Sequence, residues 1–268
     1  MSRIGTTFIK FVAWAARGFK RVVRTLGRIQ HENLEHHYLR RIFEESGETT
    51  FLQIGAHDGK TLDPMYRYLT TTECSGVMVE PVPWLFARLV ANYKPFPMIR
   101  CENCVISDHD GTTSFYTVRE DILKSQPEWG DMLGSLSREQ IVSHRDLIPD
   151  VEDYIEEQQL PCLTVRSLLQ KYGLNHVDVV LIDVEGYDYE VLKQVDLRLL
   201  GVKVIIFENV HLSKGDRRAA ERYLTNANMR VRRFNLDTIG VSREWAGWSD
   251  VFFIAIRRVL RRLNGLPN

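Results

Sequence analysis

Short apolar runs alternate with segments of helical spacing along most of the chain. The apolar runs predict strands at Thr50 to Ile54, Gly76 to Glu80, Met98 to Ser107, Val177 to Ile182, Val202 to Phe207, Met229 to Phe234 and Val251 to Ile256. The segments between them predict helices at His31 to Glu45, Asp63 to Thr70, Pro83 to Tyr93, Val165 to Tyr172, Tyr187 to Val195 and Asp216 to Asn226. This alternation predicts an α/β fold: a mostly parallel sheet of about seven strands, with helices on both faces.

Two local signals refine this pattern. Asp63 followed by Pro64 is typical of an N-cap and the first residue of a helix. The turn Asp108 to Gly111 leads into Thr113 to Val118, which we expect to pair as a hairpin with the strand before it. The alternation then stops from Arg119 to Gln159, and residues 119–162 are predicted to be a lid or a substrate insertion.

The first 30 residues predict a separate arm. Apolar residues recur there at spacings of three and four, opposite a basic face with no acid among the first 28 residues; the basic residues are Arg3, Lys10, Arg17, Lys20, Arg21, Arg24 and Arg28. This amphipathic helix suits either an anionic membrane surface or packing on protein, whether its own body or a second copy in a homo-oligomer. The main domain is expected at residues 31–256, followed by a basic tail at 257–268.

Composition adds constraints. The chain has 268 residues, 44% apolar and 26% charged, which fits one soluble α/β domain beside the arm. The formal net charge is zero, and because basic residues concentrate at both ends the middle is acidic, which argues against a nucleic-acid partner. Four cysteines make no disulfide framework, so a cytoplasmic protein is expected; Cys101 and Cys104 have the spacing of a redox or zinc half-site but lack the ligands to complete one.

Three carboxylates follow three separate predicted strands: Glu80, Asp183 and Glu208. The carboxyl ends of parallel strands open on one edge of a sheet, so these acids are expected to converge on one crevice. The first strand runs into a glycine turn at Gly55 to Gly59, which would let backbone approach a ligand closely. A tight turn after one strand and an acid after the next are typical of a nucleoside pocket.

The turn discriminates between nucleosides. A dinucleotide site shows G-x-G-x-x-G, but His57 and Lys60 fill two of these glycine positions, which disfavours a nicotinamide oxidoreductase. S-adenosylmethionine carries no phosphate. It requires one close backbone turn, polar groups for its amino acid end and an acid for its ribose, and the sequence offers all three.

Four segments together resemble the FkbM family of S-adenosylmethionine-dependent methyltransferases. They are Phe51 to Gly59, Gly76 to Pro83, Asn103 to Asp108 and Leu181 to Leu192, and the likeness covers about residues 50 to 240. The resemblance implies a Rossmann-like class I methyltransferase fold. It also implies a cofactor site formed by Gln53, Gly55, Ala56, His57, Glu80, Pro81, Asn103, Cys104 and Val105.

Within that site the resemblance implies that Gly55 and Ala56 pass beneath the cofactor and that Glu80 binds both ribose hydroxyls. Pro81 and Asn103 to Val105 would flank adenine. Many family members have aspartate in place of Gln53 and asparagine in place of His57. Gln53 can hydrogen-bond the amino acid end of the cofactor, but it does not supply the same charge.

The resemblance places Asp183 near the transferred methyl group. An alcohol acceptor needs a base, and the candidates are Asp183, Glu208 and His211. Asp183 with Glu208–Asn209 is also similar in pattern to the Mg²⁺ ligands of catechol O-methyltransferase-like enzymes, which makes Mg²⁺ a second cofactor to consider.

Acceptor contacts are expected from the insertion and from the C-terminal strands; the candidates are Ser135, Arg138, His144, Asp237, Thr238, Trp129, Trp245 and Trp248. The predicted reaction is O-methylation of a hydroxyl on a glycan or natural product. The predicted location is the cytoplasm, either away from the membrane or at its inner face. The alternative is a non-catalytic scaffold that keeps the nucleoside fold and uses the arm to dock on a membrane or partner.

Overall fold

A computed structural model describes residues 34–123, 133–146, 148–234, 236–247, 250 and 254–255. The chain divides into two compact units, one formed by residues 38–245 and the other by residues 1–37 with 246–268. The predicted arm at 1–30 and tail at 257–268 lie outside the described residues. The fold below is that of the larger unit.

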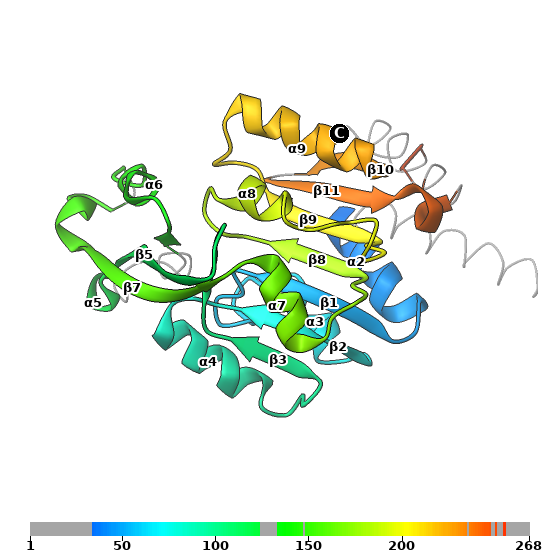
Figure 1. Cartoon of the computed structure of the whole chain (residues 1–268), viewed down its shortest axis with the longest axis horizontal. Coiled ribbons are helices and arrows are strands. Elements are labelled where there is room, and N and C mark those ends of the chain that lie inside the picture. The colour runs from blue at the N-terminus through cyan, green and yellow to red at the C-terminus, as the bar shows by residue number, and fades with distance from the viewer. Residues whose placement is uncertain are drawn as a thin grey trace, which may run out of the picture. The chain divides into compact units, whose positions relative to one another are not determined.

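The larger unit is built on a seven-stranded sheet in the order β10-β11-β9-β8-β1-β2-β3 (Figure 1). Its strands are β1 (Thr49–Ile54), β2 (Cys74–Val79), β3 (Ile99–Glu102), β8 (Val179–Ile182), β9 (Val204–Glu208), β10 (Met229–Phe234) and β11 (Asp237–Ser242). The pairs β3–β2, β2–β1, β1–β8 and β8–β9 are parallel, whereas β11 runs antiparallel to both its neighbours. The predicted α/β fold with a mostly parallel sheet is confirmed.

The central strands are covered on both faces. All four residues of β8 are buried, as expected of a parallel strand between two helical layers. Side chains alternate across a strand, and Leu52 and Ile54 belong to one apolar core with residues of α7 (Val165–Tyr172), α8 (Asp188–Leu192) and α9 (Lys214–Asn226). Figure 1 shows these three helices in front of the sheet.

The remaining helices are α2 (Leu34–Glu45), α3 (Tyr66–Leu69) and α4 (Pro83–Tyr93). Helix α4 begins with proline at its first turn, as predicted. Its Leu89 and Tyr93, with Met78 of β2, surround Gly59 so closely that a Cβ there would lie 2.5 Å from Leu89. The glycine turn after β1 is therefore packed against α4.

Two predicted boundaries are wrong. Asp63 does not cap a helix at Pro64, because α3 starts later and its N-cap is Met65; the Asp63 carboxylate instead accepts a hydrogen bond from Met65 N at 2.6 Å. The seventh strand is β11 rather than Val251 to Ile256. Of that run Ile254 and Ala255 are helical, and the rest lies outside the described residues.

The chain between β3 and α7, which includes the predicted insertion, forms a second sheet in the order β4-β7-β5-β6. Its strands are β4 (Val105–Ile106), β5 (Gly111–Val118), β6 (Gly134–Ser135) and β7 (Ile155–Leu163), with short helices α5 (Glu120–Leu123), α6 (Arg138–Val142) and the 3-10 helix η2 (Val151–Tyr154). The predicted third strand breaks into β3 and β4, and the predicted hairpin is wrong because β5 pairs along its whole length with β7. Phe115, Leu160 and Cys162 share a buried cluster with Val82 and Leu85, and this packing selects the pairing.

Candidate active site

Strand register brings the three predicted acids to one edge of the main sheet. Ile54 pairs with both Val79 and Ile182, and Ile182 pairs with Phe207. The residues that follow these four form the next row across the sheet: Gly55, Glu80, Asp183 and Glu208. The convergence that the sequence predicted is thus set by backbone hydrogen bonds.

A cavity of about 190 Å³ opens at this edge. The predicted site residues that line it are Gln53, Gly55, Ala56, His57, Glu80, Pro81, Cys104, Val105 and Asp183. Asn103 does not line it. Its amide donates hydrogen bonds to the carbonyls of Glu80 and Pro81 at 2.8 and 3.0 Å, so Asn103 supports the wall of the cavity from behind.

Gly55 is the point of closest backbone approach. It has φ of +80°, and a Cβ added there would lie 1.7 Å from Asp183 O. Gly55 N and Ala56 N both donate to Val79 O, at 3.0 and 2.9 Å, while Asp183 N donates to Ile54 O at 2.9 Å. The end of β1 is therefore wedged between β2 and β8, where only glycine fits.

Glu80 is a buried carboxylate held by backbone amides. Oε2 accepts from His57 N at 2.8 Å and Oε1 accepts from Val82 N at 2.9 Å. Burial raises the pKa of Glu80 to about 7, although these two hydrogen bonds lower it. With both oxygens fixed, its other lone pairs have a defined direction into the cavity.

The sequence analysis missed Asp58, which stabilises the turn around His57. Asp58 accepts hydrogen bonds from Lys60 N and Thr61 N at 2.9 and 2.7 Å, and it pairs with Arg88 at 2.9 Å. Burial raises the pKa of Asp58, but hydrogen bonds, led by that of His57, outweigh it and lower the pKa overall. An aspartate directly before a glycine turn was the available signal.

Asp63 was also missed as a site residue, because Asp-Pro was interpreted as a helix cap. It lines the cavity and accepts a hydrogen bond from Gln53 Nε2 at 3.1 Å. Gln53 is only 2% exposed, and its Oε1 has no hydrogen-bond partner in the protein. Burial raises the pKa of Asp63. Asp63 thus supplies, beside Gln53, the carboxyl group that position 53 itself lacks.

On the other side of Asp183 the edge is crowded with acid. Carboxylate oxygens of Asp183, Glu185 and Glu208 lie within 4.8 Å of one another. Burial raises the pKa of Asp183 to about 6, and burial together with the charges of Asp183 and Asp237 raises that of Glu208 to about 8. Burial, with the charge of Asp183, also raises the pKa of Glu185 well above its ordinary value.

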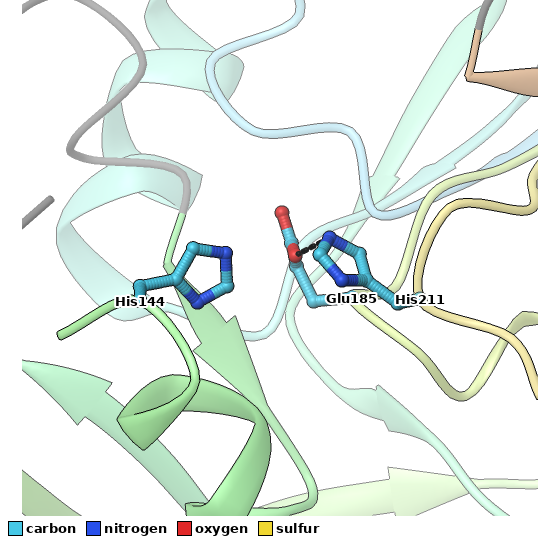
Figure 2. A group of neighbouring side chains, drawn as sticks. All are labelled: His144, Glu185 and His211. Carbon is cyan, nitrogen blue, oxygen red and sulfur yellow. Dashed lines mark ion pairs between the residues drawn. The ribbon is translucent and has the colours of Figure 1, made fainter. Parts of the chain in front are cut away.

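His211 reaches these carboxylates from the loop after β9. Its Nε2 lies 3.2 Å from Glu185 Oε2 and 3.6 Å from Glu208 Oε2, yet neither oxygen accepts a hydrogen bond. Burial, with a contribution from His144, lowers the pKa of His211, so its imidazole is neutral at pH 7. The His144 ring stands 5.4 Å away between centroids (Figure 2).

Other predicted acceptor contacts divide between two places. Ser135 Oγ donates to Glu185 O at 3.0 Å, which joins the insertion to the loop after β8. Asp237 pairs in register with Glu208, and burial followed by the charge of Asp183 raises its pKa to about 6. Thr238 Oγ1 accepts from Asn209 Nδ2 at 3.1 Å, so that amide is directed at β11.

The remaining predicted contacts lie elsewhere. Arg138 is directed at Glu152 O, 3.5 Å away within the insertion. Arg41 stacks over the Trp245 ring at 4.3 Å, so that face of the indole is covered by α2. Trp129 and Trp248 lie outside the described residues.

The cysteines are free thiols. Burial raises the pKa of Cys101 to about 11 and, with the nearby charge of Glu102, that of Cys104 to about 12, so neither is a thiolate at neutral pH. Cys104 contributes apolar surface to the cavity wall. Over the described residues, no helix has both the length and the apolar character that a membrane crossing requires.

Residues 53–262 match the model of the methyltransferase FkbM domain, which covers most of the chain. The chain belongs to the FkbM methyltransferase family. The domain of this family is a methyltransferase domain. No curated protein sequence matches it.

Solved structures similar to this FkbM domain are distant. The methyltransferase FkbM from Methylobacillus flagellatus KT shares 11% identity over 76% of this chain and 47% of its own, with a TM-score of 0.45. The METTL16 MTase domain shares 10% identity over 77% and 65%, with a TM-score of 0.42. The precorrin-6y C5,15-methyltransferase from Geobacter metallireducens GS-15 shares 12% over 77% and 87%, with a TM-score of 0.38. The chain spans less than two thirds of the first two, and the assignment rests on the family match.

The residues of the FkbM domain fit S-adenosylmethionine. The Gly55 turn allows close backbone approach, since any side chain there would collide with Asp183 O. Glu80 offers a fixed carboxylate for a diol, and Gln53 Oε1 with Asp63 offers acceptors for an ammonium group. Val105, Ile106 and Phe115 give the cavity an apolar part suited to an adenine ring.

Proposed function

We propose that this FkbM methyltransferase transfers a methyl group from S-adenosylmethionine to a hydroxyl group of a glycan or natural product. The observation that carries the proposal is the position of Asp183. It lines the cavity beside the Gly55 turn, and it also belongs to the cluster with Glu185 and Glu208. Asp183 therefore lies between the nucleoside part of the crevice and a part rich in carboxyl groups.

Each part has residues suited to its task. Bound S-adenosylmethionine supplies an electrophilic methyl group. Glu80 accepts hydrogen bonds from the ribose hydroxyls, and Gln53 with Asp63 orients the amino acid end. This fixed set of contacts aligns the reactants, which lowers the entropic cost of a displacement at carbon.

A hydroxyl acceptor must lose its proton, and the proposed oxygen chemistry requires a base near Asp183. His211 is neutral at pH 7 because burial lowers its pKa, and it lies 3.6 Å from Glu208. The pKa of Asp183, raised to about 6 by burial, leaves it ionised at pH 7. Both groups can accept a proton at that pH, and Asp183 is the one that lines the cavity.

Two measurements test the proposal. S-adenosylhomocysteine at 100 times its dissociation constant should stabilise the folded protein by about 2.7 kcal/mol, and Glu80→Ala should abolish that shift while Glu48→Gln, an exposed control, keeps it. Methyl transfer to candidate sugars, followed by mass spectrometry, should fall by about 10²–10⁴ in Asp183→Asn. The exposed control Asp146→Asn should retain full activity.

Two results would overturn the proposal. An unchanged affinity for S-adenosylhomocysteine in Glu80→Ala would remove the nucleoside assignment. Normal function of Asp183→Asn, Glu208→Gln and His211→Ala in cells would favour the non-catalytic scaffold instead.

The proposed place of action is the cytoplasm, with the basic arm at the inner face of the membrane. Its support is the sequence of residues 1–28, which carries seven basic side chains opposite an apolar face. Sedimentation with anionic vesicles should be lost when these residues are deleted. Equal sedimentation of both proteins would contradict the membrane role and leave packing on protein.

A further inference from the structure

Two histidines and a glutamate from three separate segments meet beside the cavity. His144 follows α6 in the insertion, Glu185 lies in the loop after β8, and His211 lies in the loop after β9. One ligand-capable atom from each lies within 4.8 Å of the others, and Figure 2 shows the Glu185 carboxylate between the two imidazole rings. We propose that His144, Glu185 and His211 bind a divalent transition-metal ion, with Zn²⁺ as the first candidate.

The distances suit a metal. Bonds of about 2.0–2.2 Å place neighbouring ligand atoms roughly 3.0–3.5 Å apart. His211 Nε2 and Glu185 Oε2 are already 3.2 Å apart. One ring nitrogen of His144 lies within 4.8 Å of ligand atoms of both other residues. To reach bonding distance it has to approach by little more than 1 Å at most. A change of that size lies within the reach of side-chain rotation.

The tautomer of His144 is set for binding. Its Nδ1 lies 3.0 Å from Gln140 O and donates the hydrogen bond, because a carbonyl can only accept. In the neutral imidazole Nε2 then keeps its lone pair. A histidine whose second ring nitrogen is bound to a backbone carbonyl is the usual arrangement of a metal ligand.

The carboxylates around the histidines are left in need of a cation. Glu185 Oε2 and Glu208 Oε2 are buried and accept no hydrogen bond. A buried carboxylate oxygen without a partner is costly, and a divalent ion would satisfy both oxygens at once. The ion would be bound by Glu185 and would neutralise the charge of Glu208 beside it.

The loop that presents Glu185 is held in an unusual conformation. Glu185 has φ of +50°, a left-handed backbone that is strained in a residue other than glycine. Ser135 Oγ fixes its carbonyl at 3.0 Å, and Asp188 Oδ2 accepts from Gly186 N at 3.1 Å. These bonds fix the backbone of the loop from which the Glu185 side chain reaches the two histidines.

The ligand set selects the ion. Mg²⁺ prefers an all-oxygen set, whereas two imidazoles and a carboxylate favour Zn²⁺, Fe²⁺ or a related first-row ion. Three protein ligands leave a coordination position open, as in catalytic rather than structural zinc sites. A hydroxyl acceptor bound there would lose its proton more readily, to Asp183 or Glu208, with His211 occupied as a ligand. This last role rests on the proposed function, but metal binding does not.

Metal binding can be measured on the full chain without any acceptor. The purified protein is stripped with chelator and titrated with Zn²⁺, and the bound metal is counted by mass spectrometry. We expect one site per chain that is weakened at least 100-fold in His144→Ala and in His211→Ala. His109→Ala is the matched control, because His109 is exposed and paired with Asp108 away from the crevice. Its affinity for Zn²⁺ should equal that of the parent.

Co²⁺ provides a direct view of the ligands, and S-adenosylhomocysteine separates the two proposals. The visible absorption of the Co²⁺ protein should change in His144→Ala, while thermal stabilisation by S-adenosylhomocysteine should persist and show that the variant is folded. Equal Zn²⁺ affinity in the parent and in a His144→Ala, His211→Ala double variant would overturn the site. Mg²⁺ binding that depends on Asp183 but not on His144 would also overturn it. If the parent protein binds Zn²⁺ but does not bind S-adenosylhomocysteine, the methyltransferase proposal is contradicted and the metal site is not.

Discussion

On the Glu80 side of the crevice, polar groups are held by the backbone, whereas on the Glu185 side the carboxylates face one another. Both Glu80 oxygens accept amide hydrogen bonds, at 2.8 and 2.9 Å. Glu185 and Glu208 each have a buried oxygen that accepts none. The Glu80 carboxylate is satisfied before any ligand arrives, whereas the two carboxylates on the other side require a cation or an acceptor to satisfy them.

This difference follows from where the residues come from. The Glu80 side is made by adjacent parallel strands and the turns directly after them, so the sheet register fixes it. The other side combines two loops of the main sheet with the insertion, through Ser135 and His144. Its geometry depends on contacts between segments that are distant in the sequence.

The largest expected effect comes from breaking the backbone-built side. In Gly55→Ala the new Cβ would lie 1.7 Å from Asp183 O, at a φ of +80°. We expect the free energy of unfolding in urea to fall by about 3–5 kcal/mol, the range for severe steric disruption. Gly47→Ala is the matched control, since Gly47 has φ of +83° with nothing within 4 Å of its Cβ, and it should cost only about 1–2 kcal/mol. Equal losses in the two variants would show that the close approach is not the cause.

A smaller effect is expected at the amino acid end of the nucleoside. Asp63→Asn removes the carboxyl charge beside Gln53, so an ammonium group would lose its ionic partner. We expect the dissociation constant for S-adenosylhomocysteine, measured by calorimetry, to rise about tenfold, or 1.4 kcal/mol. Asp121→Asn, an exposed aspartate of the insertion, should leave it unchanged. A normal affinity in Asp63→Asn would return the amino acid end to Gln53 alone.

The raised pKa of Glu80 predicts that both stability and ligand affinity on its side of the crevice depend on pH. Burial raises its pKa to about 7 from an ordinary 4.5, so the fold favours the protonated form. Its contribution to the free energy of unfolding is therefore present below about pH 4.5 and is lost as pH rises through about 7. The ionised form accepts ribose hydroxyls better, so affinity for S-adenosylhomocysteine should increase several-fold from pH 6 to pH 8. Glu80→Gln should remove this pH dependence, and an equally steep profile in that variant would assign it to another group.

The smallest effect is expected where the insertion touches the loop after β8. Ser135→Ala removes the hydrogen bond to Glu185 O and should cost about 0.5–1 kcal/mol of unfolding free energy, with a several-fold lower rate of methyl transfer. Ser46→Ala is the control, because its hydroxyl also donates to a carbonyl, that of Arg41 at 3.4 Å, on an exposed surface. If both variants transfer methyl groups at the parent rate, the contact has no part in placing Glu185.

Much of the main sheet could be predicted from the sequence. The bounds of α4, α7 and β10 coincide with the predicted segments, because each is set by local signals such as Pro83 and the capping hydroxyl of Thr164. Strand β11 was missed because Gly240 interrupts its apolar pattern. That glycine is required by packing, since a Cβ there would lie 2.8 Å from Ile205.

The strand that pairs with β5 could not be predicted from local sequence signals. Its partner β7 is distant in sequence, and the choice is made by Phe115 and Leu160 packing on Val82 and Leu85. For the same reason the crevice was predicted unevenly. Glu80 and Asp183 follow from the parallel-sheet rule. The meeting of Glu185 with His144 depends on a left-handed loop residue and on how the insertion folds back, and no spacing in the sequence records either.

The second sheet has a consequence for how such enzymes diversify. Both Ser135 and His144 belong to the stretch between β4 and α7, whereas the Gly55 turn and Glu80 belong to the parallel core. Substitutions around His144 can therefore accumulate during evolution without altering the Gly55 turn or Glu80. Exchanging residues 137–159 between two relatives leaves the cavity-lining Phe115, Gly134 and Leu136 in place, and should transplant the choice of methyl acceptor while each chimaera keeps its nucleoside affinity.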